Sequence, residues 1–190
     1  MDALILAGGR ARRLGGADKP ALQVGGRTLL DRVVEACAAC SRTIVVGPAR
    51  RTERDVITLR EDPPGGGPVA ALAAGLPEVL DDVVALLAAD LPFLTSAVLA
   101  ELASRLVAGV DGALLVDPDG RDQLLSGVWR TDSLRTAVAA VGPPEGQALR
   151  RLLQRLTVVR VPVGSLPPGT AHAWRDCDTP EDLREAEELA

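Results

Sequence analysis

The sequence predicts an α/β fold with a doubly wound, mainly parallel mixed sheet, and three observations support this prediction. Short apolar runs alternate along the chain with helical patterns, which is the order of βαβ units. The runs are almost continuously apolar, which indicates strands that are buried on both faces. One predicted strand follows its predecessor with no helix between them, so we expect that strand to pair in the antiparallel direction.

The predicted strands are four to eight residues long and rich in Val, Leu and Ala. Six of them are expected to be parallel: Ala3–Ala7, Thr43–Val46, Val56–Leu59, Val83–Ala88, Gly112–Val116 and Val158–Val161. The seventh, Gln123–Arg130, comes after the turn Pro118-Asp119-Gly120 and is the expected antiparallel strand.

Four helices are predicted from the residues that start them. Ser and Thr side chains cap helix N-termini, and proline is favoured in the first turn. We expect helices after Thr28, over Val69–Val79 with Pro68 opening it, from Thr95 or Ser96 through Leu106, and from Thr179 onward. Glu181 and Asp182 place negative charge in the first turn of the last helix, where the helix dipole favours it.

Length and charge limit the function classes. A chain of 190 residues fits one domain, residues 1–190, that can bury a core of its own. The net charge of −5 argues against a general nucleic-acid or membrane-surface binder. Asp2 and the strand that follows it argue against a signal peptide, and no apolar run is long enough to span a membrane. We therefore expect a cytoplasmic protein.

The cysteines agree with a reducing compartment. Cys37, Cys40 and Cys177 cannot all pair, and they form no disulfide pattern. The spacing of Cys37 and Cys40 also fits a redox or metal pair, but no histidine or second pair lies near them. We expect both to be small buried residues of a helix.

The loop Leu6–Lys19 is the most informative segment of the chain. It follows the first strand directly and carries four glycines, three arginines and a lysine. Glycine lets backbone N–H groups approach a ligand closely, and the positive charges favour a polyphosphate. The spacing excludes a P-loop and the Gly-x-Gly-x-x-Gly dinucleotide fingerprint. The alternative is a glycine-rich surface loop with solvated arginines.

Acidic residues follow other predicted strands. Ligands of open α/β sheets bind beyond the carboxyl ends of the strands. Asp90 ends the apolar strand Val83–Ala88, and carboxylates suit Mg²⁺, so we expect Asp90 to hold this ion. Asp178 is the candidate second ligand, although an Asp just before a helix also commonly caps the N-terminus of that helix. Asp62, at the start of a Pro- and Gly-rich loop, is a candidate acceptor for the N–H groups of a base.

In this order, these segments resemble the molybdenum cofactor guanylyltransferase family along nearly the whole chain. The matching segments are Leu6–Lys19, Gly66-Gly67-Pro68, Asp90-Leu91-Pro92-Phe93, Gln123-Leu124 and Asp178–Leu183. The resemblance implies a three-layer, Rossmann-like domain of the nucleotide-diphospho-sugar transferase type. It also implies Mg²⁺-dependent transfer of GMP from GTP to the phosphate of molybdopterin, with release of pyrophosphate. Partner proteins that supply molybdopterin or receive the finished cofactor are implied as well.

The resemblance assigns roles to individual residues. It places Leu6, Ala7, Gly8 and Gly9 on the guanine nucleotide, with Lys19 on its phosphates, Asp62 on the nucleotide, and Asp90 on both nucleotide and metal. Arg13 and Lys19 are expected to stabilise the leaving phosphates, as positioning and charge neutralisation supply most of the catalysis in phosphoryl transfer. The acceptor phosphate is already ionised at neutral pH, so no general base is required. We therefore give no catalytic role to His172, which we place in a short strand.

Two departures from the family pattern keep alternatives open. Gly47-Pro48 stands where many members have Asn after the second strand, and Asp176 and Asp178 stand where some members have two Asn residues. The acids Asp176 and Asp178 resemble those at the same positions of the sugar-phosphate and cytidylyl transferases. The alternatives are a related transferase that uses CTP or another phosphorylated acceptor, and a nucleotide-binding accessory protein without turnover.

The acceptor pocket is the least defined part of the prediction. Polar and aromatic residues that could form its wall are Arg121, Gln123, Ser126, Trp129 and either Arg150 or Arg151. Trp129 could equally be a core residue, which is the commoner fate of a tryptophan in a strand.

Overall fold

The computed structural model describes residues 1–8 and 16–190, and its centre is a seven-stranded mixed sheet. The strand order is β5-β4-β1-β6-β8-β7-β9. The strands are β1 (Asp2–Leu6), β4 (Thr43–Val46), β5 (Ile57–Leu59), β6 (Val83–Ala88), β7 (Gly112–Val116), β8 (Asp122–Arg130) and β9 (Val158–Pro162). A two-stranded ribbon, β2 (Gln23–Val24) and β3 (Arg27–Thr28), is separate from this sheet.

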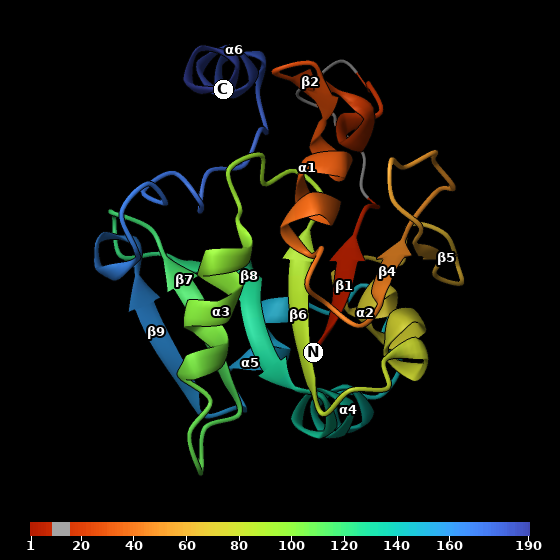
Figure 1. Cartoon of the computed structure of the whole chain (residues 1–190). Coiled ribbons are helices and arrows are strands. Elements are labelled where there is room, and N and C mark those ends of the chain that lie inside the picture. The colour runs from red at the N-terminus through yellow and green to blue at the C-terminus, as the bar shows by residue number, and fades with distance from the viewer. Residues whose placement is uncertain (9–15) are drawn as a thin grey trace.

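The predicted antiparallel strand is confirmed. β8 runs antiparallel to both β6 and β7, whereas β1, β4, β5 and β6 pair in parallel with one another, as do β7 and β9. Strand bounds differ from the predicted ones by at most one residue. The carboxyl ends of β1, β4 and β6 therefore point to the same edge of the sheet, at the top of Figure 1.

Helices cover both faces of the sheet (Figure 1). They are α1 (Leu29–Ala36), α2 (Pro68–Gly75), α3 (Ser96–Ser104), α4 (Thr131–Ala140), α5 (Leu149–Leu153) and α6 (Pro180–Leu189). Short 3₁₀ turns occur at η2 (Lys19–Ala21), η3 (Leu76–Glu78) and η4 (Val163–Ser165). The predicted helix Val69–Val79 is an α-helix only to Gly75 and continues as η3, and the predicted helix to Leu106 ends at Ser104.

Alternate residues of β1 contribute to the two cores. Ala3 and Ile5 pack with α1 and α3 on one face, and Leu4 and Leu6 pack with α2, α4 and α5 on the other. The residues Asp2–Leu6 are all buried, as the continuous apolar run predicts. This gives the three-layer architecture expected from the order of elements.

A third, smaller core holds the C-terminal helix near the carboxyl edge of the sheet. Val24, Leu29, Cys177 and Ala186 are buried together, with Phe93 and others packed against them. Thr179 caps α6 through a capping box with Asp182. The small core therefore brings the segment before α6 close to the segments that follow β1 and β6.

Candidate active site

The ends of β1 and β6 lie level with each other. Leu6 is the register partner of Ala88, and the Ala89 N–H donates to the Leu6 carbonyl at 3.2 Å. Gly8 and Asp90 each lie two residues beyond these strand ends. Neighbouring strands of a sheet are about 4.8 Å apart. The candidate nucleotide loop and the candidate metal ligand therefore begin side by side.

Lys19, the only lysine in the sequence, forms ion pairs with both Asp90 and Asp178. The side chains of Lys19 and Asp90 are each 15% exposed, whereas that of Asp178 is 50% exposed. Burial lowers the pKa of Lys19, but the charges of Asp90 and Asp178 outweigh it, so the pKa is raised above its ordinary value. Lys19 is therefore a fixed positive charge at neutral pH.

Three carboxylates gather around this lysine. One oxygen from each of Asp90, Asp176 and Asp178 lies within 4.8 Å of the others. Partial burial of Asp176, which stays in contact with solvent, and the negative charges of Asp90 and Asp178 raise the pKa of Asp176 to about 6. Because the carboxylates repel one another, the cluster can bind a cation in addition to Lys19.

The donor set suits a hard divalent cation. All three groups offer carboxylate oxygens, the ligands that Mg²⁺ prefers, and Mg²⁺ uses one or two carboxylates together with substrate phosphates. Asp90 Oδ1 is buried and has no hydrogen-bond partner in residues 1–8 and 16–190. The residues present therefore fit a magnesium site.

Arg50, which the sequence analysis did not single out, connects two loops of the site. Its guanidinium donates to Asp18 through Nε and Nη2, and Nη1 donates to the carbonyls of Ala7 (3.2 Å) and Pro48 (2.9 Å). Asp18 directly precedes Lys19, so Arg50 ties the start of η2 to the ends of β1 and β4. In the sequence, Arg50 is one of two adjacent arginines in the loop after a strand, and nothing in this pattern distinguishes it.

Gly47 allows the loop after β4 to lie against the end of β1. A Cβ on Gly47 would come within 2.7 Å of the Ala7 carbonyl carbon and oxygen, and the φ angle of Gly47 is +156°. A side chain at this position would thus require the two loops to separate.

Glu61 is a second residue that the sequence analysis missed. It lies two residues after the end of β5, is 7% exposed, and accepts a hydrogen bond from the Gly65 N–H at 2.9 Å. Its Oε1 is 3.5 Å from where a Cβ on Gly8 would be. Asp62, which the sequence analysis preferred, is exposed beside it.

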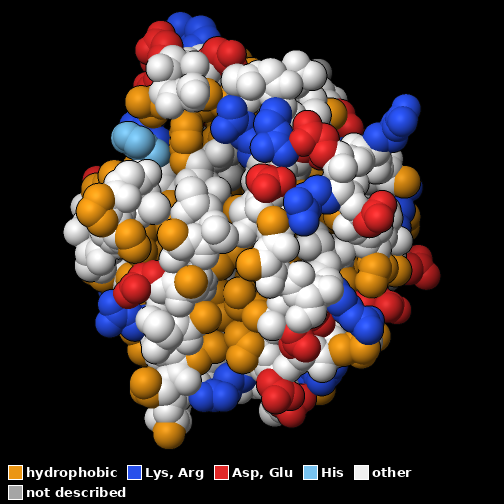
Figure 2. All heavy atoms as spheres, viewed as in Figure 1, with side chains coloured by type: hydrophobic (Ala, Val, Ile, Leu, Met, Phe, Trp, Pro, Cys, Tyr) orange, Lys and Arg blue, Asp and Glu red, His pale blue; other side chains and the backbone are white. Residues whose placement is uncertain are grey.

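The other predicted nucleotide-binding residues lie as follows. Leu6 and Ala7 are buried at the end of β1, and Gly8 is exposed. Gly9 and Arg13 lie outside the residues that the structure describes. Near the described part of the loop, positive and negative side chains lie next to one another above the strand ends, in the upper half of Figure 2.

The expected acceptor wall was wrong in two of its residues. Trp129 is fully buried and Ser126 is 2% exposed, because both lie on β8, which runs between β6 and β7. Gln123 donates to Asp117 at 3.0 Å, and Arg121 pairs with Asp119. The alternative interpretation of Trp129 as a core residue is confirmed.

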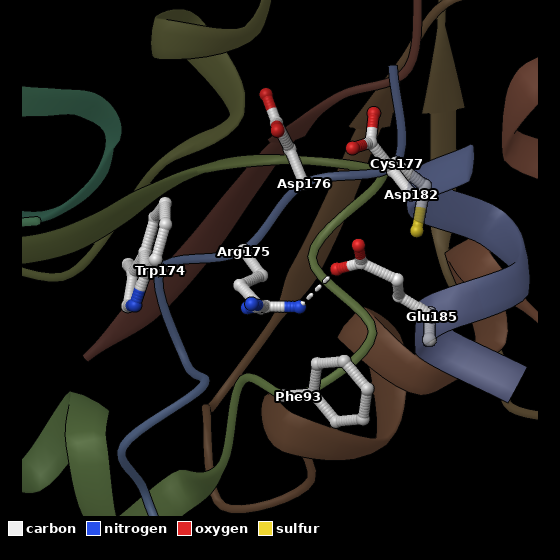
Figure 3. A pocket seen from close by; sticks show the side chains of 8 residues that line it. Phe93, Trp174, Arg175, Asp176, Cys177, Asp182 and Glu185 are labelled. Atoms are coloured by element: carbon white, nitrogen blue, oxygen red, sulfur yellow. Dashed lines mark hydrogen bonds and ion pairs between the residues drawn. The ribbon is translucent and has the colours of Figure 1, made fainter. Parts of the chain in front are cut away.

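A pocket next to the three carboxylates Asp90, Asp176 and Asp178, here called the acid cluster, has the polar and aromatic lining that was expected of the acceptor wall. It measures about 140 Å³ and is lined in part by Phe93, Trp174, Arg175 and Asp176 (Figure 3). Arg175 lies 5.8 Å from the Trp174 ring centre and donates to Glu185 at 2.8 Å. The pocket thus combines two aromatic rings with one arginine and three acids, Asp176, Asp182 and Glu185. Asp176 also belongs to the group of metal-binding candidates.

Two smaller predictions need correction. His172 lies in a turn, not in a strand, and its ring is 5.9 Å from that of Phe93. Cys37 is buried at the C-terminal cap of α1, but Cys40 lies beyond the helix and is only half-buried. Within residues 1–8 and 16–190, no helix has the length and apolar character needed to cross a bilayer.

Comparison with known proteins assigns the chain to a family. Residues 3–161 match the MobA-like NTP transferase domain. The chain belongs to this family. It is similar to two curated molybdenum cofactor guanylyltransferases. The one from Bradyrhizobium sp. (strain ORS 278) is 32% identical, over 98% of this chain and 92% of that protein. The one from Rhodopseudomonas palustris (strain HaA2) is 34% identical, over 99% and 91%.

A solved structure supports the same relationship. The molybdopterin-guanine dinucleotide biosynthesis protein A from Archaeoglobus fulgidus superimposes with a TM-score of 0.75 at 25% identity. The match covers all of this chain and 98% of that one. The nucleotide-diphospho-sugar transferase type of fold and the family, both predicted from the sequence, are confirmed.

Proposed function

We propose that this protein is a nucleotidyltransferase that transfers GMP from GTP to the phosphate of molybdopterin and releases pyrophosphate. The observation that supports this most strongly is the meeting of Lys19, Asp90 and Asp178 at the carboxyl edge of a sheet of this family. Two relatives of similar length that carry the guanylyltransferase name support the choice of GTP and of the acceptor.

The residues divide the work of the reaction between them. An oxygen of the acceptor phosphate attacks the α-phosphorus of GTP in line, and the bond to the pyrophosphate oxygen breaks. Lys19, with Arg13, stabilises the negative charge of the leaving pyrophosphate. The attacking phosphate is already an anion, so no residue has to remove a proton from it.

Asp90 and Asp178 are the residues that would hold Mg²⁺. When bound, this ion neutralises charge on the nucleotide phosphates and orients them. Because Lys19 pairs with the same two carboxylates, we expect its ammonium group to exchange them for phosphate oxygens when the nucleotide binds. Arg50 keeps Asp18, and hence the start of η2, in place during this exchange.

The acceptor would lie in the pocket between Phe93 and Trp174. A pterin is flat, so an aromatic ring that is partly exposed offers it a stacking surface. Arg175, which pairs with Glu185 in the same pocket, would exchange this carboxylate for the acceptor phosphate. Asp176 lines this pocket, and one of its carboxylate oxygens lies within 4.8 Å of one from Asp90, so the two substrates would meet at the acid cluster.

The test is a transfer assay with α-labelled GTP and molybdopterin in the presence of Mg²⁺. Labelled guanine dinucleotide and unlabelled pyrophosphate are the expected products. A product formed from CTP but not from GTP would favour the cytidylyl alternative. Nucleotide binding with no product for any acceptor would favour the accessory protein. Asp132→Asn, a change of a 93% exposed residue on α4, serves as the matched control for variants of the acids.

A further inference from the structure

Glu61 is a buried carboxylate with an unused acceptor. Only 7% of the residue is exposed, and Oε1 takes the single hydrogen bond from Gly65. Oε2 is buried and has no partner among the residues that the structure describes. Leaving a buried charged oxygen unpaired is costly, so a group that donates hydrogen bonds is expected to bind there.

The position of Glu61 relates it to the nucleotide. Its carboxylate faces Gly8, at the end of β1, from the side of β4 and β5. Asp90 and Lys19 lie on the other side of β1, next to β6. A nucleotide whose phosphates contact Lys19 and whose sugar crosses Gly8 would thus bring its base to Glu61.

The chemistry of Glu61 selects among the bases. A carboxylate only accepts hydrogen bonds, and it repels phosphate. Guanine has two adjacent donors on one edge, N1–H and the N2 amino group, which match the two oxygens of a carboxylate. Adenine and cytosine place a ring-nitrogen acceptor beside their amino group, and uracil has one N–H between two carbonyls. Guanine is therefore the base that Glu61 fits best.

Resting on the proposed function, we propose that Glu61 is a specificity-determining residue that binds the N1–H and N2 amino edge of guanine. The hydrogen bond from Gly65 N–H holds the carboxylate in place, and Gly8, which has no Cβ, lies beside it.

The test compares GTP with ITP, which differs from GTP only by the absence of the N2 amino group. Binding of each nucleotide with Mg²⁺ is measured by calorimetry for the wild type, Glu61→Gln and the exposed control Glu188→Gln. We expect the wild type and the control to prefer GTP over ITP by about tenfold or more, the effect of one charge-assisted hydrogen bond. In Glu61→Gln the ratio is expected to fall below about threefold, mainly through weaker GTP binding.

The outcomes separate this proposal from the proposed function. Equal binding of GTP and ITP by the wild type would overturn the role of Glu61 without involving any variant that could misfold. A full GTP preference in folded Glu61→Gln would overturn it as well, while Lys19-dependent GTP binding and transfer would still support the proposed function. Failure of the wild type to bind any nucleotide would overturn both. A role of Glu61 only in loop structure would weaken GTP and ITP binding equally, and would also contradict the proposal.

Discussion

The two edges of the sheet use charged residues for different purposes. At the amino edge of β6 and β7, charged groups bind to the chain itself: Asp81 pairs with the N-terminal ammonium, and Asp111 accepts from Ser133 and from the Thr157 N–H. Arg130, level with Val83, donates to the carbonyls of Val110 and Leu106. These residues close loops and stabilise helix ends.

At the carboxyl edge, the charged side chains are not all compensated by groups of the chain itself. Three carboxylates lie together around one lysine. Among the described residues, buried polar atoms without a partner occur at both edges: Asp90 Oδ1 and Glu61 Oε2 here, and Asp2 Oδ1 and Trp129 Nε1 at the amino edge. The clustering of like charges is therefore what distinguishes the carboxyl edge. An edge that leaves charges uncompensated costs stability and provides binding energy for a ligand. The contrast indicates which edge carries the function, and variants at each edge can test it.

The largest effect is expected from Asp90→Asn. The amide keeps the shape of the side chain but removes the charge that would hold the metal, so transfer activity should fall by about a thousandfold or more. GTP binding should weaken much less, because the proposed contacts of Lys19 and of the loop amides with the phosphates do not depend on Asp90. Steady-state kinetics and calorimetry measure the two quantities, and Asp132→Asn should change neither. Unchanged activity in Asp90→Asn would remove Asp90 from the metal site.

Lys19→Met should have the second largest effect. Loss of one preorganised positive charge on the phosphates lowers kcat by about a hundredfold. Because Lys19 is the only lysine, ¹³C-methylation labels one side chain, and its NMR titration in the wild type reports the pKa directly. We expect that pKa to lie above the ordinary value, and to move back toward it in Asp90→Asn. An ordinary pKa in the wild type would contradict the ion pairs with Asp90 and Asp178.

Asp176→Asn should stabilise the metal-free protein at neutral pH. With a pKa of about 6 in the folded state and 3.8 as its ordinary value, Asp176 binds more protons when folded between about pH 4 and 6. Stability therefore falls as the pH rises through this window, and the neutral amide avoids that loss. We expect the Tm to rise by about 1–3 °C at pH 7.5 and by less at pH 5. A lower Tm at pH 7.5 would argue against repulsion within the acid cluster.

Asp81→Asn should have the smallest effect, and it tests the other edge. The pKa of Asp81 is held below its ordinary value, mainly by the N-terminal ammonium and by Ser41. Its ion pair therefore contributes stability above pH 4 that is lost at more acid pH, and the exposed setting keeps this contribution small. A slightly lower Tm with unchanged GTP binding is expected. Weaker GTP binding would show that the two edges are not as separate as proposed.

Much of the fold could be predicted because its signals are local. Each parallel strand is an apolar run that ends at a polar loop, and the strand Asp122–Arg130 was recognised by the turn before it. Thr28, Thr95 and Thr179 all cap the helices that they were predicted to start. Helices α4 and α5 were missed, since Arg130 and Ala148, which precede them, offer no capping side chain.

Residues of the site were predictable where they follow a strand or belong to a motif. Lys19, Asp90 and Asp178 are brought together as the sequence analysis expected. Arg50 and Glu61 were not predictable, because their contacts depend on how loops meet: Arg50 reaches Ala7 across 43 positions of the sequence. The acceptor wall was wrong for Trp129 because a tryptophan in a central strand gives the same sequence signal whether it is core or ligand contact.

The most direct test of the central claim is thermal stabilisation by GTP, with and without Mg²⁺, in the wild type and in Asp90→Asn. A ligand that binds only the folded protein raises its Tm by mass action. We predict a shift with GTP that Mg²⁺ enlarges in the wild type and that Mg²⁺ does not enlarge in Asp90→Asn. The absence of any shift with GTP, or the same enhancement by Mg²⁺ in both proteins, would contradict the assignment of the nucleotide and metal site to the carboxyl edge of the sheet.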